Sequence, residues 1–199
     1  MDETQSAKLK KLRIIITVII SVLILGLLMW DYFHGGVPSH HLLDQKNLPA
    51  ISNWWSGLLL PVISWIMLGK IKTRIENQTK IKGRYKSGIK IVLWRFGIAL
   101  IFGIILSVSF IKNYKLFLDN VPYLLLILSF IVPIFFSEFI LGFVLGMTYT
   151  FGAILPTAFI LIIAGIGFVI YKFIRPLIMK LAQKLEINLS KAPTSSDRK

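Results

Sequence analysis

KLRIIITVIISVLILGLLMW, residues 11–30, decides the fold class of this chain. No charged residue follows Arg13 until Asp31, and almost every position between them is apolar. A helix of about 20 such residues crosses the hydrocarbon core of a bilayer, which is about 30 Å thick. No small-residue cleavage site precedes Trp30, which argues against a secretory signal peptide. The stretch therefore predicts an uncleaved transmembrane helix over about residues 12–31.

Similar apolar runs recur along the chain, which has 199 residues, 55% of them hydrophobic and 16% charged. This composition supplies too few polar residues to cover the surface of a soluble domain. It predicts an all-α, polytopic transmembrane helical bundle with four to six membrane segments in a single domain over residues 1–172. The absence of cysteine excludes disulfides and thiolate metal sites. The expected spans are about 12–31, 53–70, 90–111, 122–136, 138–151 and 153–172.

The region 121–171 is compatible with one, two or three crossings. Its 51 residues form at most ~76 Å of helix, whereas three full crossings need ~90 Å. Two crossings fit the length but leave the basic C-terminal segment on the outer side. Short or re-entrant helices within 121–151, with a turn at Ser137–Glu138, reconcile the length with a cytoplasmic C-terminus.

The distribution of Lys and Arg predicts the orientation of these spans. Their numbers are four in residues 8–13, one in 31–52, eight in 70–90, two in 112–120 and seven in 172–199. Cytoplasmic segments carry the excess of basic residues, so the N-terminus, residues 70–90 and the C-terminus are expected in the cytoplasm. The expected location is the bacterial cytoplasmic (inner) membrane.

The formal net charge of +14 indicates a partner of opposite charge. Because the charges flank apolar spans and form no nucleic-acid-binding module, we expect anionic lipid headgroups as partners rather than nucleic acid. Residues 173–199 follow the last span and are expected to form an amphipathic helix on the membrane surface, then a disordered basic tail. The apolar face of that helix is predicted from Phe173, Leu177, Leu181 and Leu185.

All three histidines of the chain lie in DYFHGGVPSHHLLDQ, residues 31–45, which is predicted to face outward. Ser39 is expected to cap a short helix over residues 40–45, on which His40 and Asp44 would share a face. Imidazoles and carboxylates can form a ligand- or proton-binding site or a metal site in this segment. The alternative is that these residues only stabilise a structural loop. The candidate ligand or proton site consists of His34, His40, His41, Asp31 and Asp44, together with Glu138 deeper in the chain. The candidate site for zinc or another divalent metal consists of His34, His40, His41 and Asp44.

Glu138 stands inside the apolar run IVPIFFSEFILGFVLG, residues 131–146. A carboxylate at bilayer depth is costly, so it usually faces a polar cavity or a partner and marks a proton or cation site. The alternative places Glu138 at the turn of a helical hairpin. Gly142 and Gly146 form a GxxxG pattern, which predicts close helix packing and is compatible with a homo-oligomer.

Three functions remain open from the sequence. The first is a non-enzymatic membrane protein that binds or translocates a small solute, ion or lipid through a polar site at the outer face. The second is a membrane-embedded, metal-dependent hydrolase or transferase that uses the His/Asp loop. The third is an accessory or scaffold subunit of a membrane complex. No catalytic signature appears at a usable spacing, so we prefer the first hypothesis and expect no cofactor.

Overall fold

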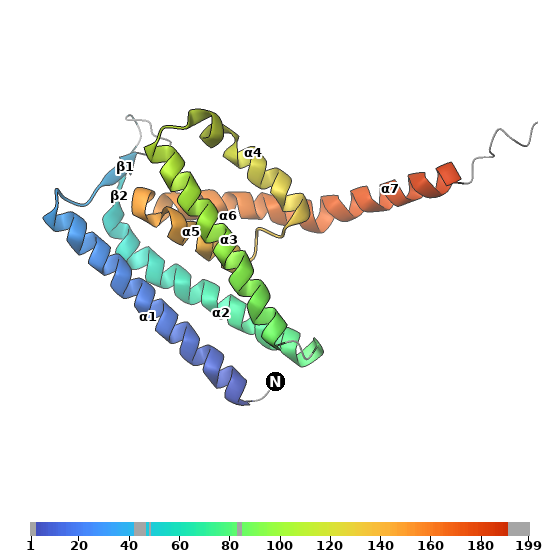
Figure 1. The fold of residues 1–199 in the computed structure, drawn as a ribbon, viewed down its shortest axis with the longest axis horizontal. Coiled ribbons are helices and arrows are strands. Elements are labelled where there is room, and N and C mark those ends of the chain that lie inside the picture. Colours follow the sequence, from blue (N-terminus) through green and yellow to red (C-terminus); the bar gives the residue numbers. More distant parts are fainter. Residues whose placement is uncertain (1–2, 42–46, 48, 83–84, 191–199) are drawn as a thin grey trace, which may run out of the picture.

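The computed structural model describes residues 3–41, 47, 49–82 and 85–190, without the side chains of residues 41, 82 and 185–190. Within these residues the chain forms helices and one small antiparallel ribbon (Figure 1). The elements are α1 (Glu3–Phe33), β1 (Ser39–His41), β2 (Ala50–Ser52), α2 (Ser56–Lys82), α3 (Tyr85–Ile111), α4 (Lys115–Ile131), α5 (Ser137–Phe151), α6 (Ile154–Val169) and α7 (Arg175–Ser190). A 3₁₀ turn, Asn53–Trp55, precedes α2, and a π-helical turn, Ile170–Ile174, joins α6 to α7.

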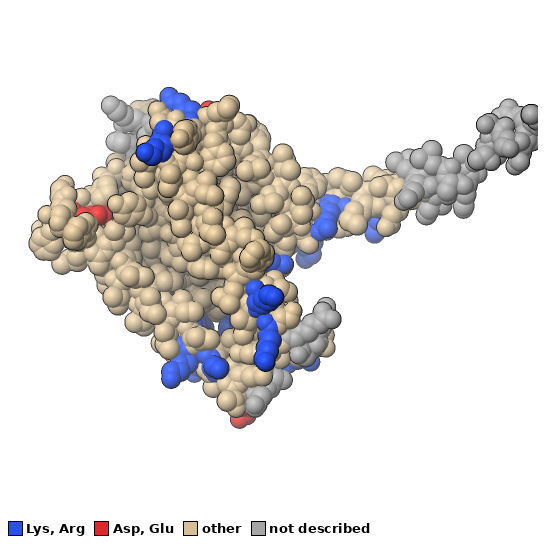
Figure 2. Space-filling model, in the orientation of Figure 1, with Lys and Arg blue, Asp and Glu red and all other residues tan. Residues whose placement is uncertain are grey.

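Four helical segments of the described chain are long and apolar enough to cross a membrane. They are Glu3–Phe33, Asn53–Ile81, Tyr85–Ile111 and Ile154–Lys184. Their outer faces are apolar, and Leu23 and Ile162 are 67% and 65% exposed. Figure 2 shows few charges on the flank of the bundle that faces the viewer. The predicted all-α class is confirmed, and the four helices indicate an integral membrane protein.

The bundle has two chemically different ends. The basic end is formed by the start of α1, the end of α2 and the start of α3, where Ser6 Oγ donates a hydrogen bond of 2.6 Å to Glu76. Lys and Arg gather there in Figure 2. The histidine end carries β1 and β2 and the final turns of α3 and α5, where the ring centroids of Phe110 and Phe151 lie 4.5 Å apart.

Helices α2 and α3 continue well beyond the spans expected to end at residue 70 and to begin at residue 90. The basic segment between those limits is therefore mostly helical. Ile71 and Ile75 are one helical turn apart, and both are buried in a small apolar cluster with Leu9 of α1. This cluster gives the charged helix ends an apolar seam, while their Lys and Arg side chains occupy other faces of the helices.

A turn over residues 132–136 joins α4 to α5. Pro133 disfavours helical backbone at the residue before it, and Val132 is accordingly extended, with φ −114° and ψ 134°. The turn was expected at Ser137–Glu138, but these residues already form the first turn of α5. Helix α5 has 15 residues, or about 22 Å, which is shorter than the hydrocarbon core of a bilayer. The number of crossings in 121–171 stays a prediction.

Helix α5 lies at the centre of the bundle and packs closely on α3. Gly142 and Gly146 face the backbone of α3: a Cβ built on Gly142 would lie 2.5 Å from the Phe96 carbonyl oxygen, and one on Gly146 would lie 2.5 Å from that of Leu100. Ser107 Oγ of α3 donates a hydrogen bond of 3.2 Å to the Gly146 carbonyl. The GxxxG pair therefore lies where two helix backbones meet within this chain.

The loop between α1 and α2 differs from the expected capped helix. Ser39–His41 is a strand that pairs antiparallel with Ala50–Ser52, and the Asn53 amide donates to the Pro38 carbonyl at 3.0 Å. The predicted helix over 40–45 is therefore wrong for its first two residues. The returning chain offers their backbone groups partners across the ribbon, so an internal helical turn is not needed. Residues 42–46 lie outside the described residues.

The C-terminal helix continues α6 through the π-helical turn into α7, and Figure 1 shows α7 projecting away from the bundle. Phe173, Leu177 and Leu181 are between 54% and 60% exposed. These are three of the four side chains that were expected on the apolar face of an interfacial helix, and the side chain of the fourth, Leu185, lies outside the described ones. The helix is present, and its position on a membrane surface stays a prediction. The tail over 191–199 lies outside the described residues.

Candidate functional site

Glu138 is the most completely buried acidic residue among those described, with no exposed side-chain surface. Arg74 of α2 donates through Nη2 to one of its carboxylate oxygens, and Arg95 of α3 lies with Nη1 3.3 Å from the other. The two Arg side chains are 22% and 27% exposed. One carboxylate, in the first turn of α5, thus joins three helices through two ion pairs.

Two local features stabilise this arrangement. The ring of Phe136, the residue before α5, lies 4.4 Å from Cζ of Arg74 and 4.6 Å from Cζ of Arg95, within cation–π range. Glu138 also stands in the first turn of α5, where the helix dipole favours negative charge. The carboxylate therefore has its counter-charges, and both guanidinium groups contact the same aromatic ring.

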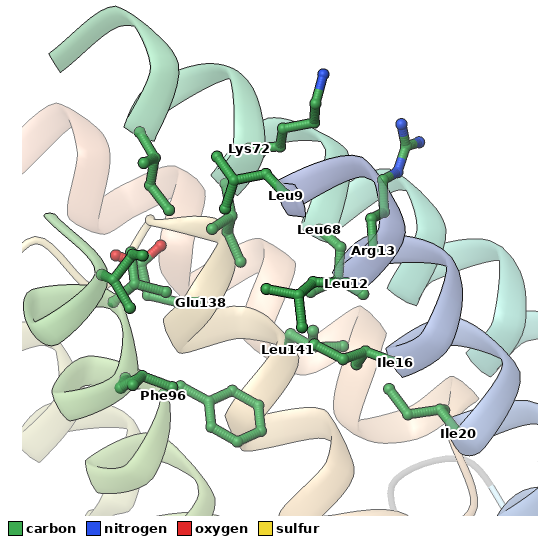
Figure 3. Close-up of a pocket in the computed structure, with 15 residues that line it drawn as sticks. Leu9, Leu12, Arg13, Ile16, Ile20, Leu68, Lys72, Phe96, Glu138 and Leu141 are labelled. Carbon is green, nitrogen blue, oxygen red and sulfur yellow. The ribbon is translucent and has the colours of Figure 1, made fainter. Parts of the chain in front are cut away.

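An apolar cavity of about 230 Å³, here called the crevice, lies beside Glu138. Helix α1 forms one wall through Leu12 and Ile16, and α3 forms the other through Leu93 and Phe96. Helices α2 and α5 contribute its floor through residues that include Leu68 and Leu141. Figure 3 shows Leu12, Ile16, Phe96 and Leu141 around the space between the helices, with the carboxylate of Glu138 at one side.

The charged groups at the crevice do not give it a polar interior. Figure 3 shows the charged ends of Arg13 and Lys72 pointing away from its centre. Lys72 Nζ lies 3.2 Å from Glu76, and the Arg13 guanidinium lies 3.7 Å above the ring of Trp65. Both oxygens of Glu138 are engaged by the two guanidinium groups. The crevice can accommodate a hydrocarbon chain without leaving any of these charges unpaired.

The structure places Glu138 in the first turn of α5, just after the turn at which the structural alternative put it. The residue is also buried with charged partners. These partners are two cations, so a metal cation would have to displace them to reach the carboxylate. The triad of Arg74, Glu138 and Arg95 therefore resembles a structural ion-pair network that links three helices more than an open cation site.

Sequence reasoning did not identify Arg74 and Arg95 as partners of Glu138. Arg74 counted only as one of the basic residues in 70–90 that set the orientation. The sequence did contain a hint of the pair with Arg95. An acidic residue in an apolar run needs a partner, and apart from Lys90 at its start the expected span 90–111 contains one basic residue, Arg95. The hint did not include Arg74, which is 64 residues away from Glu138 in the sequence.

The structure gives His34 and His40 different neighbours. His34 is exposed at the end of α1, stacks on Trp30 at 3.9 Å and hydrogen-bonds through Nδ1 to the Trp30 carbonyl at 2.9 Å. His40 lies in β1 with its ring centroid 5.8 Å from that of Phe151. Asp31 accepts the amide of Gly36 through its backbone carbonyl. The side chain of His41 and all of Asp44 lie outside the described residues.

Within the described residues, no three His, Cys, Asp or Glu side chains approach one another closely enough to hold a metal ion. Because the proposed metal site includes His41 and Asp44, it stays a prediction. Comparison of the chain with protein-family models, with curated proteins and with solved structures gives no match. The function must therefore be inferred from the geometry of the chain itself.

Proposed function

We propose that this protein binds a membrane lipid by accepting a hydrocarbon chain into the crevice between α1 and α3. Of the three hypotheses from the sequence, this is the first, a protein that binds or translocates a small solute, ion or lipid, with a lipid as the ligand. The proposed site lies toward the basic end and not at the outer face. One observation carries it: a cavity of about 230 Å³ with apolar walls lies between helices whose outer faces are also apolar. An enclosed apolar cavity of about 150 Å³ is already large enough to bind benzene.

The crevice suits a lipid better than a polar solute. A chain that moves into it from the bilayer exchanges one apolar environment for another, so binding depends on van der Waals fit and not on the hydrophobic effect. A polar solute would lose its hydration and find no free hydrogen-bonding group, because Glu138 is occupied by Arg74 and Arg95.

The orientation is part of the proposal: the basic end faces the cytoplasm and the histidine end faces outward. The excess of Lys and Arg in residues 8–13 and 70–90 supports it through the positive-inside rule. The crevice would then open toward the cytoplasmic leaflet, since its lining begins at Leu9 and includes Ile75 and Ile89, near the basic end.

Single cysteines at Asn47 and Ser87 are expected to react on opposite sides of the membrane. Both residues are exposed, and the natural chain has no cysteine to interfere. A membrane-impermeant maleimide should label the Asn47→Cys variant in intact bacterial cells. It should label the Ser87→Cys variant only after the cytoplasmic membrane is permeabilised. The reverse pattern would show that the basic end faces outward.

Replacing Leu12 with tryptophan is expected to reduce lipid binding, because the larger side chain fills the crevice from the α1 wall. We expect the amount of lipid retained by the detergent-purified protein, measured by native mass spectrometry, to fall about tenfold, equivalent to ~1.4 kcal/mol.

Leu23→Trp is the matched control. It makes the same substitution on α1 at a site that is 67% exposed and does not line the crevice. Lipid retention in this variant should equal that of the unmodified protein. Equal retention by the Leu12 and Leu23 variants would contradict lipid binding in the crevice.

A further inference from the structure

A second hollow lies on the opposite face of α2, and it differs from the crevice in its chemistry. It is an open groove of about 760 Å³. Lys70, Thr73 and Asn77 line it, whereas Leu68 and Ile75 line the crevice. Residues 68 and 70 point in directions about 200° apart on a helix, so the two sites lie on opposite faces of α2.

The groove concentrates positive charge. Arg13 of α1, Lys70 and Arg74 all line it, and none of its lining residues is acidic. The hydroxyl of Thr73 and the side-chain amides of Asn77 and Gln78 add neutral hydrogen-bonding groups beside these cations. Cations accompanied by neutral donors are the groups that bind phosphate oxygens.

Two of the three cations are held in place by contacts within the protein. Arg13 Nε donates to the Trp65 carbonyl at 3.1 Å while its guanidinium lies over the Trp65 ring. Gly69 leaves room for this position, because a Cβ there would lie 2.9 Å from Nη2 of Arg13. Arg74 is held by Glu138. Such pre-organisation lowers the entropy lost when a ligand binds, and each guanidinium keeps further N–H donors for that ligand.

One part of the groove is apolar. Trp65 and Ile66 line it on the side toward the middle of α2, and both are exposed. A free anion would make no use of this surface, whereas the glycerol and first methylenes of a phospholipid would lie along it. Aromatic residues also favour the headgroup region of a bilayer.

We propose that this groove is a binding site for the phosphate of an anionic phospholipid, with Arg13, Lys70 and Arg74 on the phosphate oxygens and Trp65 against the lipid body. The groove opens on the other face of α2 from the crevice, although Arg13 borders both, and the proposal does not rest on the function proposed above.

The test uses the full-length protein in detergent and measures the apparent Kd of soluble short-chain lipids. The probes are short-chain phosphatidylglycerol, short-chain phosphatidylcholine and inorganic phosphate. We expect phosphatidylglycerol to bind about tenfold more tightly than either of the others, a difference of ~1.4 kcal/mol. Lys70→Gln removes an exposed cation from the groove and should weaken phosphatidylglycerol binding by about tenfold.

Lys90→Gln is the control, because Lys90 is also exposed near the basic end but lies on α3 outside the groove. It should leave the Kd of phosphatidylglycerol unchanged. If Lys70→Gln and Lys90→Gln weakened phosphatidylglycerol binding equally, the affinity would come from general attraction by net charge. That result would contradict a binding site in the groove. Equal affinity for phosphate and phosphatidylglycerol would identify a free-anion site, and equal affinity for the two lipids would exclude recognition of an anionic headgroup. Leu12→Trp should not change this Kd, which separates the groove from the crevice.

Discussion

Glu138→Gln is expected to lower the stability of the bundle by about 3 kcal/mol, the range seen when one partner of a buried ion pair is removed. The variant keeps the shape of the side chain but removes its charge. Arg74 and Arg95, both mostly buried, would then face each other without a counter-charge. Thermal or denaturant unfolding in detergent, followed by circular dichroism, measures the loss.

Two controls separate this effect from a general sensitivity to charge. Glu76→Gln breaks the pair that Glu76 makes with Lys72 one turn away on α2, while the amide oxygen can still accept from Ser6 Oγ, so the change should cost no more than about 1 kcal/mol. The double variant Glu138→Gln/Arg95→Gln removes one of the stranded cations and should recover part of the stability lost in the single variant. If the double variant were less stable than Glu138→Gln, unpaired positive charge would not be the cause of the loss of stability.

Gly142→Ala or Gly146→Ala is expected to cost about 2 kcal/mol, within the range for overpacked interiors. A Cβ at either position would lie 2.5 Å from a carbonyl oxygen of α3, and because that oxygen belongs to a helix backbone, the whole helix has to move. Helix α5 also carries Glu138 about one turn before Gly142. A displaced α5 should therefore weaken the contact with Arg95 as well. Unfolding in detergent measures the loss of stability.

Gly97→Ala is the matched control on α3, where a Cβ would have no neighbour within 4 Å. Because alanine has the higher helix propensity, this variant should be neutral or slightly more stable. If all three alanine variants lost the same stability, close approach of α3 and α5 would not be the cause.

The sequence predicts the parts of the fold that depend on local composition. The apolar run after Arg13 predicts α1, the run over 53–70 covers the 3₁₀ turn and the first half of α2, and the run over 90–111 lies within α3. It does not reveal how far α2 and α3 extend, because their basic ends are helical through burial of Ile71 and Ile75 against Leu9. A basic segment that a hydropathy profile would assign to a loop can continue a helix when apolar residues on one face of that helix are buried.

The candidate site was only half visible in the sequence. Glu138 was identifiable because a carboxylate in an apolar run needs a partner. Its partners Arg74 and Arg95 lie 64 and 43 residues away, and their role depends on how α2, α3 and α5 cross. The strand at Ser39–His41 was missed for a similar reason, since its hydrogen-bonding partners lie across the ribbon in Ala50–Ser52.

Local composition is enough to predict that this chain forms apolar helices long enough to span a bilayer. Backbone groups in hydrocarbon must bond within their own segment, so composition and length suffice to predict a helix. The three-dimensional arrangement shows which helices touch, where α5 lies, and that two arginines pair with Glu138 beside an apolar crevice. The GxxxG pattern marks one packing face of α5 but not its partner, because these contacts join residues that are distant in the chain.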